Sequence, residues 1–502
     1  MLMKNKFAIF TIVFITSFLI RLPNIGIESI NPDAVNWHYR CQQFANGLKY
    51  FQFERTYPHY HPGVTLCWIM VFPTEIYKKL SNQEIYNNSN YLDFNIYNTL
   101  ALVLVISLLI GVVSYQLGYA KGYIFALLLN FEPFYFGNSK LIHLDTLHSL
   151  LILIGLIFVW KYVEKYTSAE NSDGIKGYFN LILSGFIFAL AFLTKSVTLV
   201  FLPFVVLFLI LLPIKNSNKL GYFKNVGFFI IPFAVSVFIL FPALWINPSE
   251  YLLRIIKEAD RIGIRTGHSQ LFFGNFYGEN EDPGALFYIF TLLLKFSPLF
   301  IFSILILAYE FFRSGRYKTL LKTRSAGLLF FSAYLFYVLA LLYSDKKVDR
   351  YLLLLVPLVF YFLSFYYLKY IKPLGFLLIL NIISVVYFSP YQFLYFSPLL
   401  LNFENANAII GQKSFGMGVV ELKKYIVETY GEKSLGFYDI KPIETIYPNS
   451  KVFDIRQTSA SKVDIVILSK NEILPEKYKD IFIPSDVFYL GEIPLYEIYT
   501  KK

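Results

Sequence analysis

The stretch that decides the interpretation of this sequence is NPDAVNWHYRCQQFANGLKYFQFERTYPHYHPGVTLCW, residues 31–68. It is polar, aromatic and rich in histidine, although long apolar segments precede and follow it. Its apolar side chains recur at the spacing of one helix face and predict an amphipathic helix: Trp37, Cys41, Phe44, Ala45 and Leu48. A second segment, residues 64–80, is too short to span a bilayer and contains Pro73. We therefore expect two helices at a membrane surface.

The composition around this stretch is that of a membrane protein. The chain has 502 residues, of which 56% are hydrophobic and only 16% are charged. A soluble domain would expose too much apolar surface at this composition, so the sequence predicts a polytopic α-helical membrane protein in a lipid bilayer. The net charge of +11 comes mostly from short loops between apolar runs, so we expect no nucleic-acid partner.

Eleven apolar runs predict membrane-spanning helices, at residues 7–22, 92–117, 122–136, 146–162, 178–193, 197–214, 226–245, 285–312, 326–343, 351–370 and 374–388. The first resembles a signal peptide, but Arg21-Leu22-Pro23 stands where a cleavage site would follow, so it reads as an uncleaved span. The distribution of lysine and arginine between loops predicts a cytoplasmic N-terminus. An odd number of spans then places the residues after about 390 on the outer side of the cell membrane.

Two domains are expected. Residues 1–395 form the transmembrane domain, with a first outer loop at 23–91 and another outer loop at 247–283. Residues 396–502 read as an extracytoplasmic α/β domain. In it, helical spacing from Val419 to Tyr430 ends at Gly431, and short strand-like runs follow at 435–438, 452–455, 463–468, 487–490 and 495–499.

Two acids are the candidate catalytic residues. Asp33 stands just before the predicted amphipathic helix, where it could cap the helix, act as a general base, or do both. Asp145 lies at the outer end of a span, where acids are costly and usually functional. His143 and His148 flank it and His59 and His61 form another pair, but no three ligands have metal-site spacing. We therefore expect no metal and no other cofactor, with a divalent ion as the alternative.

Cations in loops expected outside are candidate phosphate ligands, because they run against the usual charge bias. Lys346, Lys347 and Arg350 lie between two spans, and Arg350 could bind a phosphate through two donors. The alternative is a solvated turn with snorkelling side chains. Lys195 follows a span and reads equally as a phosphate ligand or an interfacial anchor, and Arg265 lies in the basic, glycine-rich loop at 247–283.

The chain contains two cysteines, Cys41 and Cys67, both in the first outer loop. A disulfide would require their Cα atoms to lie within about 7 Å of each other, which a sequence does not reveal. Two separate thiols are the expectation, with a disulfide as the alternative.

Several short motifs, in this order along the chain, resemble the dolichyl-phosphate-mannose-protein mannosyltransferase family and its bacterial aminoarabinose-transferase-like relatives. They are the segments 32–40 (PDAVNWHYR), 61–64 (HPGV), 141–148 (LIHLDTLH), 241–248 (FPALWINP), 272–274 (FFG), 283–288 (PGALFY), 346–351 (KKVDRY) and 389–396 (SPYQFLYF). The resemblance implies a type C glycosyltransferase (GT-C) fold, a polyprenyl-phosphate sugar donor and an outward-facing active site. It maps a catalytic acid onto Asp33 and a second-loop acid onto Asp145. Many members have Asp-Glu where this chain has Asp33-Ala34.

The expected function is a glycosyltransferase that moves a sugar, with inversion, from a polyprenyl phosphate to a hydroxyl of a lipid, glycan or protein acceptor. Asp33 would be the base, and Arg350, Lys347, Lys346, Lys195 and Arg265 would hold the donor phosphate. Sugar and acceptor would contact aromatic and histidine side chains: Trp37, His38, Tyr39, Tyr57, Tyr60 and His61. The alternative function is a transporter or flippase of lipid-linked sugars. The long first loop and the outer domain argue against it, and the sequence shows none of the repeats or broken helices that are typical of transporters. A non-catalytic scaffold is the third reading.

Overall fold

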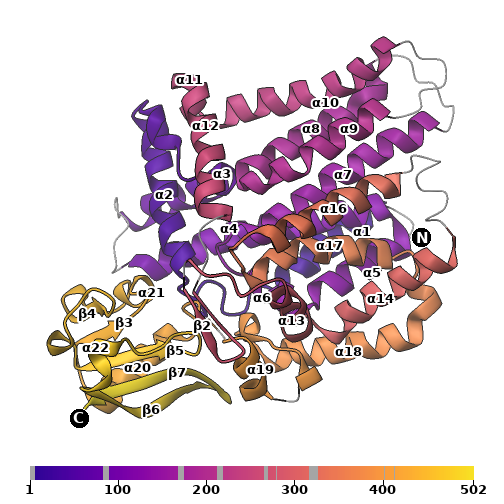
Figure 1. Cartoon of the computed structure of the whole chain (residues 1–502). Coiled ribbons are helices and arrows are strands. Elements are labelled where there is room, and N and C mark those ends of the chain that lie inside the picture. The colour runs from indigo at the N-terminus through magenta and orange to yellow at the C-terminus, as the bar shows by residue number, and fades with distance from the viewer. Residues whose placement is uncertain are drawn as a thin grey trace.

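The computed structural model describes residues 6–82, 90–167, 175–211, 219–264, 269–278, 280–315, 326–400, 402–411 and 413–502. A helical bundle fills most of the molecule, and a small sheet domain is attached at one end of it (Figure 1). The α2 helix (Pro32–Lys49) and the C-terminal domain both lie at that end. The structure therefore confirms a helical membrane protein with a small C-terminal α/β region.

The helices of the bundle differ in length and are mostly apolar. Their bounds are α1 Lys6–Leu19, α4 Tyr91–Leu117, α5 Tyr119–Asn130, α6 Pro133–Ser139, α7 Asp145–Thr167, α8 Ile175–Thr194, α9 Leu202–Leu211, α10 Lys219–Leu240, α16 Ala326–Tyr343, α17 Leu355–Leu363 and α18 Ile371–Tyr387. Among the described residues, five helices are long and apolar enough to cross a membrane, or six if one bent pair counts as a span. The expected count of eleven is not confirmed, because several apolar runs form helices of 10–17 residues.

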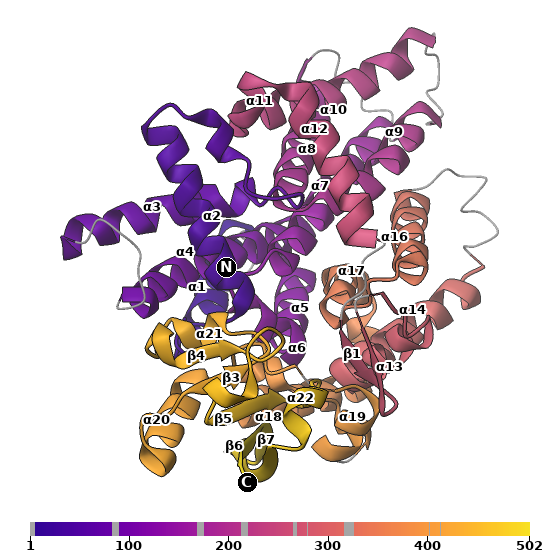
Figure 2. The same ribbon diagram turned by 60° about the vertical axis from the view of Figure 1, so that its left-hand side comes forward.

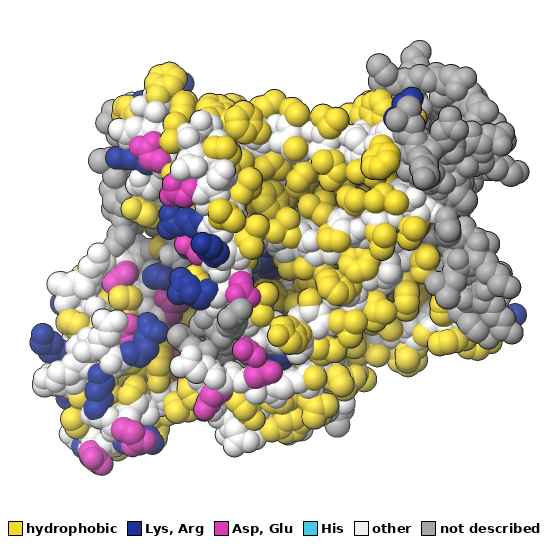
Figure 3. Space-filling model, turned by 45° about the horizontal axis from the view of Figure 1, so that its top comes forward, with side chains coloured by type: hydrophobic (Ala, Val, Ile, Leu, Met, Phe, Trp, Pro, Cys, Tyr) yellow, Lys and Arg dark blue, Asp and Glu magenta, His cyan; other side chains and the backbone are white. Residues whose placement is uncertain are grey.

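The bundle exposes the apolar surface that a lipid environment requires. Figure 3 shows hydrophobic side chains across the helices, while charged side chains gather over the C-terminal domain and the adjoining end of the bundle. Phe238, Ile239, Phe376 and Val386 are all about half exposed or more on membrane-spanning helices. A hydrophobic surface that extends over several helices is unfavourable in water, so this surface fits a bilayer.

One predicted span is wrong. The run at 285–312 was expected to be a single helix, but it forms α13 (Leu286–Lys295) and α14 (Pro298–Arg313), bent by 118°. Ser297 caps α14 by accepting a hydrogen bond from the Phe300 amide, and Pro298 occupies the first turn. The first helix ends here because Pro298 has no amide hydrogen with which to continue it. The Ser297 amide, which has no partner within the helices, donates a hydrogen bond of 3.0 Å to the buried carboxylate of Glu132.

The polar segments between the helices carry two helices of their own, α2 (Pro32–Lys49) and α3 (Val64–Ser81). The predicted apolar face of α2 is buried, with Trp37 4% exposed and Phe44 fully buried. Both predicted helices are therefore present, and their place at the membrane surface stays a prediction. Later in the chain, α11 (Ala243–Ile246) and α12 (Pro248–Glu258) precede the short hairpin β1 (Gln270–Phe272) and β2 (Asn275–Tyr277).

The C-terminal domain is a mixed sheet with strand order β4-β3-β5-β7-β6. Its strands are β3 Leu435–Phe437, β4 Val452–Asp454, β5 Ile465–Ser469, β6 Phe482–Leu490 and β7 Ile493–Lys501. The central strand β5 is buried along its whole length, because α20 (Val419–Tyr430) packs on one face and a cluster around Tyr478 packs on the other. As predicted, α20 ends at Gly431, whose φ of 74° suits a residue without a side chain. The short α21 (Lys441–Glu444) lies next to α2 (Figure 2).

Candidate active site

Asp33 lies in the first turn of α2 and faces a cavity. The helix is capped by Asn31, whose side-chain oxygen accepts a hydrogen bond of 2.6 Å from the Ala34 amide. The suggestion that Asp33 is the cap residue is therefore wrong, because Asn31 performs that role two positions earlier. The carboxylate of Asp33 is left free to make tertiary contacts, although it still lies at the favourable, positive end of the helix dipole.

Cys41 of α2 and Cys67 of α3 form a disulfide, so the expectation of two separate thiols is wrong. The two helices are in contact, and the Cα atoms of the two cysteines lie 4.6 Å from each other, within the range that a disulfide needs. The bond joins the helix that carries Asp33 to the helix that follows the histidine-rich loop.

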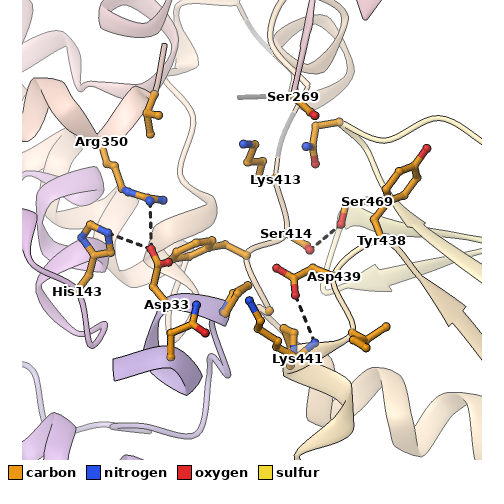
Figure 4. A pocket seen from close by; sticks show the side chains of 18 of the residues that line it. Asp33, His143, Ser269, Arg350, Lys413, Ser414, Tyr438, Asp439, Lys441 and Ser469 are labelled. Atoms are coloured by element: carbon orange, nitrogen blue, oxygen red, sulfur yellow. Dashed lines mark hydrogen bonds and ion pairs between the residues drawn. The ribbon is translucent and has the colours of Figure 1, made fainter. Parts of the chain in front are cut away.

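A cluster of charged side chains joins the two candidate acids. One oxygen of Asp33 lies 3.1 Å from the Arg350 Nη2 atom and 3.2 Å from the His143 Nε2 atom. Asp145 forms an ion pair with Lys195, and its other oxygen lies 3.0 Å from the His143 Nδ1 atom and 3.4 Å from the Arg350 Nε atom. His143 and Arg350 thus each bridge both acids, and Figure 4 shows both side chains directed at the Asp33 carboxylate.

The electrostatic balance keeps Asp33 ionised. Burial alone would raise the pKa of Asp33, but the Arg350 guanidinium and the His143 imidazole outweigh it and hold the pKa well below its usual range. In this state Asp33 is a weak base, because its negative charge is already stabilised by its partners.

The charged cluster opens into a cavity of about 690 Å³ between the helical bundle and the C-terminal domain. This volume is in the range typical of small-molecule sites. From the bundle, the lining includes Asp33, His143 and Arg350. The opposite wall belongs to the C-terminal domain and includes Lys413, Phe415, Asp439, Lys441, Arg456 and Glu472. Sequence reasoning missed this wall, since these residues lie in loops without a recognisable motif.

The structure separates the predicted sugar-binding residues into two groups. Trp37, Tyr60 and His61 line the cavity. His38 is buried away from it, where its ring nitrogens bond to the side chains of Asn95 and Asn98 at 3.2 and 3.1 Å. The other two also lie outside the lining of the cavity: Tyr39 is 60% exposed, and Tyr57 donates a hydrogen bond of 3.1 Å to Glu258.

Two histidines of the cavity, His59 and His61, are held in the neutral form. Burial and, secondarily, the nearby Arg40 lower the pKa of His59 to about 3. Burial and the Lys195 ammonium lower that of His61 well below its usual value. Neither side chain adds positive charge to the cavity near neutral pH.

The predicted phosphate ligands are divided in the same way. Arg350, Lys195 and Lys346 line the cavity, whereas Arg265 lies outside the described residues. Lys347 is fully buried elsewhere, where its ammonium donates to the Leu342 carbonyl at 3.1 Å and lies 3.4 Å from Asp282. Carbonyls at the end of α16 lack amide partners within the helix, so the geometry gives Lys347 the contacts of a helix-capping cation.

The histidines around Asp145 have partners other than a metal. His148 bonds to the Thr198 hydroxyl at 2.8 Å, and His143 lies between the two acids. Within the part of the chain that the structure describes, no group of three or more His, Cys, Asp or Glu side chains is arranged to hold a metal ion. The expectation that catalysis needs no cofactor stays a prediction.

Comparison with known proteins points to one family. Residues 11–252 match the model of the dolichyl-phosphate-mannose-protein mannosyltransferase family. No curated protein matches the chain significantly. The crystal structure of ArnT from Cupriavidus metallidurans bound to undecaprenyl phosphate is similar with a TM-score of 0.49 and 11% identity, over 98% of this chain and 97% of that one. The predicted resemblance to the mannosyltransferase family is therefore confirmed over residues 11–252, the part that contains Asp33, Asp145 and Lys195.

Proposed function

We propose that this chain is a membrane glycosyltransferase of the GT-C type that takes a sugar from a polyprenyl-phosphate donor. The acceptor is a hydroxyl of a lipid, glycan or protein, and the transferred sugar is a hexose or pentose. The active site faces the outer side of the membrane. The match to a family that uses a lipid-phosphate-linked mannose supports the donor class.

The observation that carries this proposal is the junction of Asp33 and Arg350. The two residues are 317 positions apart, yet their side chains meet at 3.1 Å in the wall of one cavity. An acid that can take a proton and a fork-shaped cation that can bind a phosphate are the two groups that this transfer needs. A polar cavity at the end of an apolar bundle also suits a substrate with a charged head and an apolar tail.

In the proposed step, the acceptor oxygen attacks the anomeric carbon from the side opposite the donor phosphate. The bond between that carbon and the phosphate oxygen breaks, and its electron pair remains on the phosphate. The proton of the acceptor hydroxyl passes to Asp33, so the configuration inverts and a free lipid phosphate leaves. A positioned general base is typically worth about 10²–10⁴-fold. Preplaced cations stabilise the charge that grows on the phosphate.

Binding of the donor would also strengthen the base. In the structure, Arg350 holds the Asp33 carboxylate in its ionised form. A donor phosphate that takes hydrogen bonds from the same guanidinium would weaken this hold and raise the pKa of Asp33. Asp145 keeps Arg350 in place through its Nε atom, 3.4 Å away. In this proposal Asp145 is a positioning residue. It also supplies the second negative charge, which many family members have at the position of Ala34.

The test uses the purified full chain with polyprenyl-phosphate sugars and candidate acceptors, and it compares wild type with Asp33→Asn. We expect transfer by wild type and a loss of about 10²–10⁴-fold in the variant, whose donor binding should be at least as tight as that of wild type because the competing Asp33 charge is gone. Equal transfer by both proteins would remove Asp33 as the base.

One observation favours a second candidate, a flippase of lipid-linked sugars. The bent pair α13 and α14 is a broken helix of the kind found in transporters, although no such break was expected from the sequence. Movement of a lipid-linked sugar across vesicle membranes, without transfer from any donor tested, would favour this candidate over the enzyme.

A further inference from the structure

The charges next to Asp33 nearly cancel. Two acids, Asp33 and Asp145, face two cations, Arg350 and Lys195, and each cation contacts at least one acid. A phosphate placed at Arg350 would bring negative charge close to both carboxylates. Burial of such a charge is costly unless further cations compensate for it. The donor site proposed above therefore needs more positive charge than Arg350 and Lys195 supply, because Asp33 and Asp145 already balance these two cations.

A suitable cation comes from the C-terminal domain. Lys413 lines the same cavity as Arg350 and Asp33. Figure 4 shows its side chain in the cavity, on the same side as Arg350. Burial and the proximity of Arg350 lower the pKa of Lys413 to about 8, and Asp349, Glu472 and Asp33 act in the opposite direction. The ammonium is thus still largely charged near neutral pH.

The segment that carries Lys413 is fixed to the segment that precedes Asp33. The Ile30 amide donates to the Gly416 carbonyl at 3.2 Å, and the Gly418 amide donates to the Glu28 carbonyl at 3.3 Å. A side chain on Gly416 would come within 2.0 Å of the Ile30 carbonyl oxygen, so only glycine allows this approach.

Phe415 links this segment directly to Arg350. Its ring lies with its centre 5.0 Å from the guanidinium carbon and stacks on Phe393. Its φ of 49° is in the left-handed region, which is uncommon for a residue with a side chain and often marks a functional site. The segment therefore supports Arg350 from one side while it brings Lys413 into the cavity beside it.

We propose that Lys413 is a ligand of the donor's phosphate group, supplied by the C-terminal domain and held in place by the segment 413–418. The ligand class is a phosphate monoester or diester anion at the head of a lipid. The C-terminal domain thereby completes the donor site of the bundle. This inference rests on the proposed function, because it assigns the phosphate to the Arg350 end of the cavity.

The experiment measures binding of undecaprenyl phosphate to the full chain in detergent micelles, and competition by inorganic phosphate. The variants are Lys413→Gln, Lys413→Arg and Arg350→Ala. Lys470→Gln is the matched control, because it removes a cation of the same domain that pairs with Glu497 at 2.7 Å outside the cavity lining. Thermal unfolding of each variant shows that it is folded.

We expect Lys413→Gln to weaken binding of undecaprenyl phosphate about tenfold or more, the usual effect of losing one charged hydrogen bond. Competition by inorganic phosphate should weaken in parallel, Lys413→Arg should restore most of the affinity, and Lys470→Gln should bind as wild type does. If Lys413→Gln keeps its affinity while Arg350→Ala loses binding, the inference about Lys413 is overturned and the proposed function is not. Loss of lipid binding with unchanged competition would also overturn the inference about Lys413, because this side chain would then contact another part of the lipid. If Arg350→Ala also binds normally, the donor site itself is refuted.

Discussion

Truncation of Arg350 tests whether the charged cluster is organised as described. Arg350→Ala removes the cation that contacts both acids, at 3.1 Å from Asp33 and 3.4 Å from Asp145. Lys195 and His143 remain beside Asp145, but Asp33 keeps only His143. The variant therefore leaves a partly desolvated carboxylate with one neighbour that is charged only when protonated.

The expected cost follows from burial. Removal of one partner from a buried ion pair typically costs about 3–5 kcal/mol. The side chain of Asp33 is 31% exposed and that of Asp145 is 7% exposed, so water reaches one of the two acids. We therefore expect the lower end of the range, a loss of about 3 kcal/mol in the free energy of unfolding.

The assay is unfolding of the purified chain in mixed micelles, and the decisive comparison is a double variant. Arg350→Ala combined with Asp33→Asn removes the stranded charge, so it should recover about 1–2 kcal/mol of the loss. Arg313→Ala is the control, because this exposed arginine lies 3.7 Å from Glu310 and such pairs contribute about 1 kcal/mol or less. A double variant no more stable than Arg350→Ala would refute the pairing of Asp33 with Arg350.

Three further predictions follow from described features. Because the pKa of Asp33 is depressed, its carboxylate stays ionised as the pH falls, so kcat/KM and stability should show no loss due to Asp33 between pH 7 and about 4; an Asp33-dependent loss centred near pH 6 would contradict this. Reduction of the Cys41–Cys67 disulfide, or serine at both positions, should lower the free energy of unfolding by about 3 kcal/mol for its separation of 26 residues, and an unchanged unfolding midpoint would count against the bond. Gly416→Ala should weaken both thermal stability and undecaprenyl phosphate binding because its Cβ would collide with Ile30. Gly491→Ala has a similar positive φ but open space around it, so it should lose only the stability that the strained backbone costs and should bind the lipid as wild type does.

The sequence predicts the helical membrane class and the small α/β region at the C-terminus because both signals are local, but it does not predict the number of spans. An apolar run or an alternation of side chains is visible within twenty residues, and α20 begins and ends at the predicted Val419 and Tyr430. The break between α13 and α14 was missed, although Pro298 marks it. Hydropathy averages over Ser297 and Lys295, and the partner that stabilises the turn, Glu132, lies 165 residues away.

The acids of the candidate site were also found from local signals, since Asp33 and Asp145 stand out in apolar or aromatic surroundings. Their partners were harder to identify. Lys347 and Arg350 are close in sequence and equally cationic, but one caps a helix while the other reaches the cavity. His38 and His61 differ in the same way. The direction of each side chain depends on tertiary packing, which the spacing of residues does not encode.

The distance along the chain between the parts of the cavity has a consequence for how the protein is made. Asp33 is synthesised early, but Arg350 follows 317 residues later and Lys413 later still. Until those segments emerge, the N-terminal helices hold an acid without its main counter-charge beside a bilayer. The last membrane helix, α18, ends at Tyr387, so insertion of the helices would finish before the C-terminal wall of the cavity is made, and assembly of that wall would be the last step of biogenesis. A folding defect in that wall should then yield a protein that is inserted and stable enough to accumulate, yet unable to bind its lipid.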